Sequence, residues 1–242
     1  WYKYWDKSCK PGYAEQFVEK KPEYFARSYP GTSSMYLLGT RTHYPNDKDI
    51  PPQVCMSSED VVKHFAEEAV NGYNGKWNVG VIVRAARLPD CPWFYSIVED
   101  DNHGICGCEK CSKLFAGRDE KSRKSMMHFD WVNRIAREAA KIDPNVGITT
   151  LSYGTAIYYP EGLELEPNVS IMMTFGVSNW WHPVIRKRHH DVILKEWAEQ
   201  AAKKKNILQM WTYFLSPGWD AKVVFKYNDF FPCFGASKIG PI

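Results

Sequence analysis

The chain has 242 residues, of which 44% are hydrophobic and 24% charged, and its formal net charge is +3. These values are typical of a globular protein with a sizeable core, and they argue against disorder, a collagen-like fold and a dedicated nucleic-acid-binding arm. No apolar run approaches the roughly 20 residues that a helix needs to cross a bilayer, so the sequence predicts no membrane span.

The N-terminal third predicts short elements around one clear helix. Ser57 or Ser58 is the expected N-cap of this helix, because acidic residues fill its first turn. The expected elements are a short helix at 22–26, a strand at 35–40, the helix at 57–71 and a strand at 79–84.

From residue 93 onward, apolar runs alternate with long helical patterns. The helix at 122–141 is the best defined, since its apolar residues recur about every 3.6 positions and Asp143-Pro144 ends it. The expected elements are strands at 93–98, 146–153, 168–174 and 207–214 and helices at 122–141 and 184–205.

Such alternation predicts an α/β fold with a parallel sheet that is covered on both faces. The candidates are a (β/α) barrel and an open doubly wound sheet. No glycine-rich phosphate-binding motif follows any strand, which removes the usual nucleotide-binding reason for an open sheet. We therefore predict a (β/α)8, TIM-barrel-like fold that is incomplete in this chain, since a full barrel takes about 250 residues. Residues 1–242 are expected to form a single domain of a longer protein.

An acidic segment follows the expected strand at 93–98. Glu99, Asp100 and Asp101 stand at its carboxyl end, where barrels carry their catalytic groups. Neighbouring carboxylates push their pKa values apart, so one of them can stay protonated and act as a general acid on a glycosidic oxygen. The alternative interpretation is a solvated loop whose acidic side chains cap turns.

A cysteine-rich motif, Cys106-x-Cys108-x-x-Cys111, comes directly after the acidic segment. Three thiolates could supply most of a tetrahedral zinc shell, with Cys55, Cys91 or His103 as the fourth ligand. Disulfides to distant cysteines are an alternative, and a metal or redox centre with a functional role is a further one. A structural metal or disulfide loop is favoured over a catalytic thiol, and no cofactor is required for the predicted reaction.

Aromatic residues and histidines cluster at or just after the expected strand ends. Flat rings with a polar handle are suited to stacking on sugars, although packing in a core is the alternative for each of them. The candidate substrate-binding residues are His103, Tyr153, Trp180, His182, Trp211 and Tyr213.

Several short motifs in this order resemble the bacterial domain of unknown function 4838 family. The most specific is the pattern Asp101-x-x-Gly-x-Cys106-x-Cys108-x-x-Cys111. The others are Pro22-Glu-Tyr-Phe-Ala26, Gln53-Val-Cys55, Trp131-Val-Asn133, Leu151-Ser-Tyr153, Pro167-Asn-Val169, His182-Pro183 and Trp211-Thr-Tyr213.

That family is similar to α-glucuronidases and other barrel glycoside hydrolases. The resemblance implies a catalytic barrel in an exported protein, extracellular or periplasmic, that acts in polysaccharide breakdown. It assigns the role of the catalytic acid to Asp101. The sequence departs from a complete hydrolase pattern because no second carboxylate follows a later strand. Glu161, Glu164 and Glu166 precede a strand and are expected on the wrong face.

Two functions follow from these observations. The first is a glucuronidase-like glycoside hydrolase that acts on an oligo- or polysaccharide, with Asp101 as general acid and Asp100 or Glu99 tuning it. The second is a non-catalytic carbohydrate-binding barrel that keeps the aromatic pocket and the structural cysteine loop. Neither involves a nucleic acid.

Overall fold

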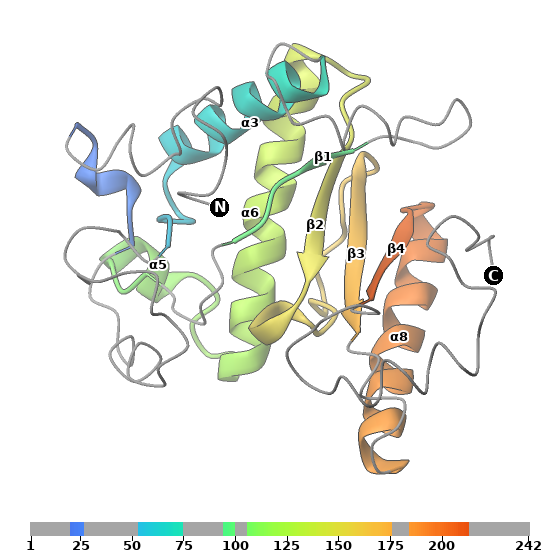
Figure 1. Cartoon of the computed structure of the whole chain (residues 1–242). Helices are drawn as coiled ribbons and strands as arrows, with labels where there is room; N and C mark the ends of the chain where they lie inside the picture. The colour runs from blue at the N-terminus through green and yellow to red at the C-terminus, as the bar shows by residue number, and fades with distance from the viewer. Residues whose placement is uncertain (1–19, 27–52, 75–93, 100–105, 176–183, 213–242) are drawn as a thin grey trace, which may run out of the picture.

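The computed structural model describes residues 20–26, 53–74, 94–99, 106–175 and 184–212 (Figure 1). The helices in these ranges are η1 (Pro22–Tyr24), α3 (Glu59–Tyr73), α5 (Glu109–Lys113), α6 (Glu120–Ile142), η2 (Gly154–Ala156) and α8 (Val184–Lys204). The strands are β1 (Tyr95–Ser96), β2 (Ile148–Ser152), β3 (Val169–Phe175) and β4 (Leu208–Thr212).

The four strands form one parallel sheet in the order β1-β2-β3-β4. Ser96 pairs with Thr149, and Thr149 pairs in turn with Ser170, so the first three strands are held in one register. The predicted α/β class with a parallel sheet is therefore confirmed for the described residues. The strands expected at 35–40 and 79–84 lie outside them.

Both faces of this sheet are buried. On one face Thr150 contacts His128 of α6 and Tyr95 packs against Gly72 of α3. Side chains alternate along a strand, so Thr149 points to the opposite face, where it is 5% exposed. Its neighbour on that face, Ser170, is completely buried. Figure 1 shows α6 alongside β1 and β2, with α3 across its upper end and α8 beside β4.

Helix α6 is the central support of the sheet. Asp119 begins it, since its carboxylate accepts hydrogen bonds from the backbone N–H groups of Lys121 and Ser122, each at 3.1 Å. This cap lies upstream of the start expected from the apolar pattern, which is why the helix is longer than predicted. Its fully buried stripe packs between the sheet and the other helices, and it consists of Phe129, Trp131, Val132, Ile135, Ala136 and Ala139.

Helix α3 begins two residues later than the sequence suggested. Ser58 is its N-cap, and the Ser58 hydroxyl accepts a hydrogen bond from Val61 N at 3.4 Å. The hydroxyl of the neighbouring Ser57 points elsewhere and contacts the sulfur of Cys111 at 3.0 Å. Of the two serines that the sequence offered as N-cap, one therefore caps the helix and the other faces the cysteines.

The contact between α3 and β1 leaves no room for a side chain at Gly72. A Cβ atom there would lie 1.9 Å from Cε2 of Tyr95. We expect Gly72→Ala to lower the free energy of unfolding by about 1–2 kcal/mol. A contact this short belongs to the upper part of the cost of overpacking, about 2–3 kcal/mol, and the gain in helix propensity returns about 1 kcal/mol. Urea denaturation measures this change. Lys63→Ala, on the exposed side of α3, is the control and should change stability by less than about 0.5 kcal/mol.

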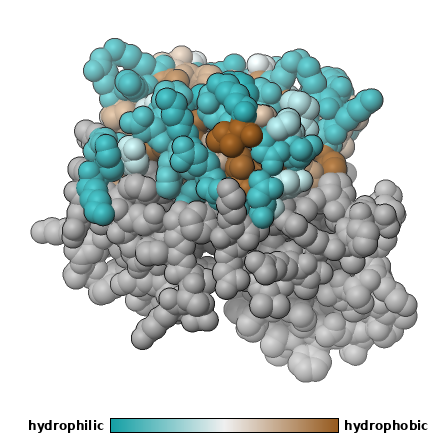
Figure 2. All heavy atoms as spheres, turned by 90° about the horizontal axis from the view of Figure 1, so that it is seen from above, coloured by the Kyte–Doolittle hydropathy of each residue, from teal (hydrophilic) through white to brown (hydrophobic). Residues whose placement is uncertain are grey.

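The surface of the described part is mainly polar. Figure 2 shows one face on which hydrophobic atoms gather only in small patches. Four large hydrophobic side chains are exposed among the described residues, namely Ile142, Tyr153, Val192 and Ile207. Across those same ranges, no helix combines the length and the apolar character that crossing a membrane demands.

Candidate metal centre

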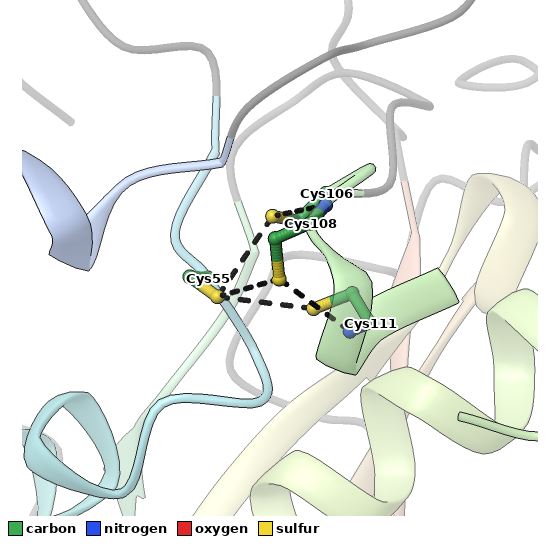
Figure 3. Close-up of side chains that lie close together, drawn as sticks. All are labelled: Cys55, Cys106, Cys108 and Cys111. Carbon is green, nitrogen blue, oxygen red and sulfur yellow. Dashed lines mark hydrogen bonds between the residues drawn. The ribbon is translucent and has the colours of Figure 1, made fainter. Parts of the chain in front are cut away.

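Four cysteines from two distant segments meet at one point (Figure 3). The sulfur of Cys55 lies 3.8 Å from each of the sulfurs of Cys106, Cys108 and Cys111. All four sulfurs lie within 4.8 Å of one another. Cys55, Cys106 and Cys111 are buried and Cys108 is partly exposed. The close-up shows Cys55 on one side of the cluster and the three cysteines of the motif on the other.

Backbone contacts fix Cys55 in place. An isolated antiparallel bridge joins Phe25 to Val54. Next to it, Cys55 N donates to the carbonyl of Tyr24 at 2.8 Å, and Cys55 O accepts from Ser58 N at 3.0 Å. The segment before Cys55 is thus tied to η1, and the segment after it leads directly into α3.

The other three cysteines are arranged by a tight turn into the short helix α5. Cys108 is the N-cap of α5, and its sulfur accepts a hydrogen bond from Cys111 N at 3.4 Å. The sulfur of Cys106 accepts from Cys108 N at 3.5 Å. These two N–H···S bonds turn the three sulfurs toward one another. One residue separates Cys106 from Cys108 and two separate Cys108 from Cys111, so the turn brings all three to one side.

Two arginines of α6 hold the two halves of the cluster. Arg123 donates to the carbonyls of Cys111 at 2.7 Å and Leu114 at 3.0 Å. Arg134 donates to the carbonyl of Met56, the residue after Cys55. The same guanidinium pairs with Asp130 at 2.9 Å, which fixes its direction. Helix α6 therefore supports both segments that carry the cysteines.

The geometry of the cluster fits a tetrahedral metal ion. Zinc–sulfur bonds of about 2.3 Å place the sulfurs of a tetrahedron about 3.8 Å apart, which equals the three separations from Cys55. A disulfide would require about 2.05 Å, and all four cysteines are free thiols. The residues present could hold a metal ion, and four thiolates form the closed donor set of a structural site.

The thiols influence one another's ionisation. Contacts with the sulfur of Cys106 and then with that of Cys111 hold the pKa of Cys55 well below its ordinary value. The pKa of Cys111 is raised far above its ordinary value, because its contacts with Cys106 and Cys55 favour the protonated thiol. Burial alone would raise the pKa of Cys108, but hydrogen bonds from Cys111 N–H and Ser57 outweigh it and lower that pKa. A thiolate is thus already favoured at Cys55, and it is the form that binds metals.

A second polar group lies at the end of β1 and was missed by the sequence analysis. His128 of α6 is buried, and its Nε2 lies 2.9 Å from the hydroxyl of Thr150 on β2. Its Nδ1 lies 3.6 Å from the carboxylate of Glu99. A single histidine among apolar residues of a helix gives no signal by itself, and only the sheet brings Glu99 and Thr150 to it.

The contact between Glu99 and His128 predicts measurable coupling. We expect His128→Leu to lower the free energy of unfolding by about 1–3 kcal/mol, because the Thr150 hydroxyl loses its partner and Glu99 loses the facing imidazole. In a double-mutant cycle with Glu99→Gln, the coupling energy should exceed that of the exposed Lys195–Glu199 pair of α8, about 0.3–0.5 kcal/mol. A coupling energy in urea denaturation no larger than that of the exposed pair would contradict this prediction.

The other predicted site residues are distributed as follows. Tyr153 follows β2 and is 38% exposed. Trp211 lies within β4. Glu164 and Glu166 pair with Lys204 at 2.8 Å and Arg137 at 2.6 Å, on the segment that precedes β3. The remaining candidates lie outside the described residues, namely Asp100, Asp101, His103, Trp180, His182, Tyr213 and the alternative ligand Cys91.

Comparison with known proteins places the chain in a family without assigning an activity. A family model described as "Domain of unknown function (DUF4838)" matches residues 10–216, well over half of the chain. No curated protein and no solved structure matches it. The resemblance found in the motifs is confirmed at the level of this family, and the similarity to α-glucuronidase-like barrels stays a prediction.

Proposed function

The chain belongs to the DUF4838 family, and on this premise we propose that it is a carbohydrate-active (β/α)-barrel domain of the glycoside hydrolase class with a structural zinc site. The observation that carries the proposal is the position of the four-cysteine cluster. Glu99 follows β1, and Cys106 joins the cluster seven residues later, so the acidic segment runs from the sheet to the cysteine cluster. Both ends of the segment that contains Asp101 are thus fixed.

The strand order supports a barrel over an open sheet. In doubly wound sheets the strand order reverses at a switch point, whereas in a barrel each strand lies beside the next one along the chain. The four described strands are parallel and follow the chain order without a reversal. The carboxyl end of β1, where Glu99 stands, is then the edge at which barrel enzymes carry their site.

Zinc is the ion that fits the cluster best. Four thiolates in tetrahedral geometry select zinc or iron, and a closed shell without an open position is typical of structural zinc. Bound at Cys55, Cys106, Cys108 and Cys111, the ion supplies a cross-link between the segment before α3 and the segment before α6. This cross-link would hold the two segments together as a disulfide does.

The chemistry proposed for the sheet edge is acid catalysis on a glycosidic bond. Asp101 is the general acid, and Asp100 or Glu99 tunes it as a neighbouring carboxylate. Tyr153, Trp180, Trp211 and Tyr213, with His103 and His182, bind the sugar rings by stacking and hydrogen bonding. The substrate class is an oligo- or polysaccharide, in an extracellular or periplasmic setting.

One observation favours the second candidate function, a carbohydrate-binding barrel without catalysis. Glu164 and Glu166, which precede β3, are engaged by Lys204 and Arg137. A hydrolase needs a second carboxylate about 5–9.5 Å from the acid, and these two glutamates are held in ion pairs on the segment before β3.

A comparison of wild type and Asp101→Asn separates the two functions. The zinc-loaded full chain is incubated with a panel of plant and bacterial polysaccharides, and reducing ends and retained binding are both measured. The hydrolase proposal predicts release of reducing ends by wild type and a loss of at least about 100-fold in Asp101→Asn with binding retained. Binding without cleavage by both proteins supports the binding barrel. Neither cleavage nor binding would contradict both functions.

A further inference from the structure

The hydroxyl of Ser57 lies against the cysteine cluster and is not used by the helix that follows. Its Oγ lies 3.0 Å from the sulfur of Cys111, 3.3 Å from that of Cys55 and 3.7 Å from that of Cys108. The adjacent Ser58 caps α3. Ser57 therefore faces three of the four sulfurs from the side of the N-terminal segment.

The direction of this hydrogen bond must reverse when a metal ion binds. In the free-thiol cluster the Cys111 S–H donates to Ser57 Oγ. A metal-bound cysteine is a thiolate and has no proton to give. At the same separation, only the Ser57 O–H can then be the donor, and a thiolate sulfur the acceptor.

The loaded cluster needs such a donor because it is negatively charged and largely buried. Four thiolates around a divalent ion leave a net charge of about −2, which burial penalises unless hydrogen bonds stabilise it. Backbone N–H groups reach the sulfurs of Cys106 and Cys108. In the described part of the chain, Ser57 is the residue outside the cysteines that reaches the other two sulfurs. Its hydroxyl contacts the sulfurs of Cys111 and Cys55, and its backbone N–H contacts that of Cys55 as well. The hydroxyl is therefore the donor available to Cys111.

We propose that Ser57 is a functional part of the metal site. Its single hydroxyl proton is donated to the Cys111 thiolate at 3.0 Å, with the Cys55 thiolate at 3.3 Å as the alternative acceptor, and this hydrogen bond sets both the affinity for zinc and the electron density on the sulfurs. This inference rests on the proposed zinc site. Groups that hydrogen-bond to metal ligands typically change metal affinity by about 10–100-fold when they are removed. A hydrogen bond also lowers the energy of the sulfur lone pairs, which makes the thiolates harder to oxidise and less nucleophilic.

The experiment compares Ser57→Ala with Ser58→Ala in the full chain. Zinc affinity is measured by competition with a chelator, and the cobalt(II)-substituted protein reports the sulfur-to-metal charge-transfer band. We expect Ser57→Ala to bind zinc about 10-fold more weakly and to shift this band to longer wavelength. Ser57→Thr keeps the hydroxyl and should restore both values. Ser58→Ala should lose thermal stability by removal of the helix cap and leave the band unchanged.

The possible results separate this inference from the zinc proposal. If wild type binds zinc and cobalt(II) through four sulfurs, but Ser57→Ala matches Ser58→Ala in affinity and spectrum, Ser57 has no role in the metal site and the inference is wrong. If wild type binds neither ion through sulfur, the zinc proposal fails and the inference with it. A charge-transfer shift in Ser57→Ala that is absent in Ser57→Thr supports both the zinc proposal and the role of Ser57 in the metal site.

Discussion

Cys55→Ser is expected to lose zinc binding and to loosen the connection between the segment before α3 and the segment before α6. Among the described residues, Cys55 alone supplies a ligand from its side of the cluster, and its sulfur is 3.8 Å from each of the other three. Removing a group that merely contacts a ligand costs about 10–100-fold in affinity, so the loss of a ligand should cost at least 100-fold. Competition with a chelator measures this ratio. Zinc present at 100 times its dissociation constant stabilises a fold by about 2.7 kcal/mol, and that stabilisation should be absent in the variant.

Cys91→Ser is the matched control for this prediction. The sequence alone offered Cys91 as an alternative fourth ligand, whereas the cluster is complete with Cys55. The control should therefore bind zinc as wild type does. Loss of zinc in Cys91→Ser and its retention in Cys55→Ser would contradict the assignment of the ligands.

The zinc affinity of wild type should fall as the pH falls. Metal binding displaces the protons of the thiols, so protons compete with the ion at low pH. The pKa of Cys111 is raised by its contacts with Cys106 and Cys55, so this thiol holds its proton against the ion as the pH falls. Stabilisation by zinc is thus greatest at neutral to alkaline pH and is lost on acidification. A zinc affinity that does not change between neutral and mildly acidic pH would exclude thiolate ligation.

Trp197→Ala is expected to have the largest effect on stability away from the metal centre. Trp197 of α8 is fully buried, and its ring packs edge-on against Phe129 of α6 with centroids 4.9 Å apart. Its Nε1 donates to the carbonyl of Ile157 at 2.8 Å. Truncating a buried tryptophan to alanine costs about 3–5 kcal/mol, a large part of the stability of a domain. Urea denaturation measures the loss, provided that the variant folds.

Trp197→Phe keeps this prediction testable if the alanine variant does not fold. Phenylalanine preserves most of the ring contact and leaves the Ile157 carbonyl without its donor, so we expect a loss of about 1–3 kcal/mol. Glu196→Ala, at an exposed position one residue earlier on α8, should change the free energy of unfolding by less than about 0.5 kcal/mol. Equal losses in Trp197→Phe and Glu196→Ala would show that the hydrogen bond from Trp197 to Ile157 does not stabilise the fold.

The long elements could be predicted from the sequence because their patterns are local. The apolar period of 122–141 predicted α6 to within a few residues, since the side chains that repeat every turn are those that meet the sheet. The difference at its start has a local cause, the Asp119 cap. The strand expected at 93–98 is reduced to Tyr95–Ser96, because pairing with β2 and not apolar content determines where a strand ends.

The candidate metal centre was predictable in part. The spacing of Cys106, Cys108 and Cys111 predicts that one turn of the chain supplies three ligands. The spacing does not choose among Cys55, Cys91 and His103 as the fourth, although Cys55 belongs to one of the family motifs. What brings Cys55 to the cluster is the packing around the bridge between Phe25 and Val54. The roles of Ser57, Arg123 and Arg134 depend likewise on how α3, α5 and α6 pack, so they became visible only in three dimensions.

X-ray absorption at the zinc edge, on full chain purified without added metal, tests the central claim most directly. With the metal content measured on the same sample, the account predicts one zinc per chain, surrounded by four sulfurs at about 2.3 Å. Mass spectrometry should then find Cys55, Cys106, Cys108 and Cys111 protected from alkylation until the zinc is removed. A zinc-free protein, or one with disulfides among these four cysteines, would contradict the account.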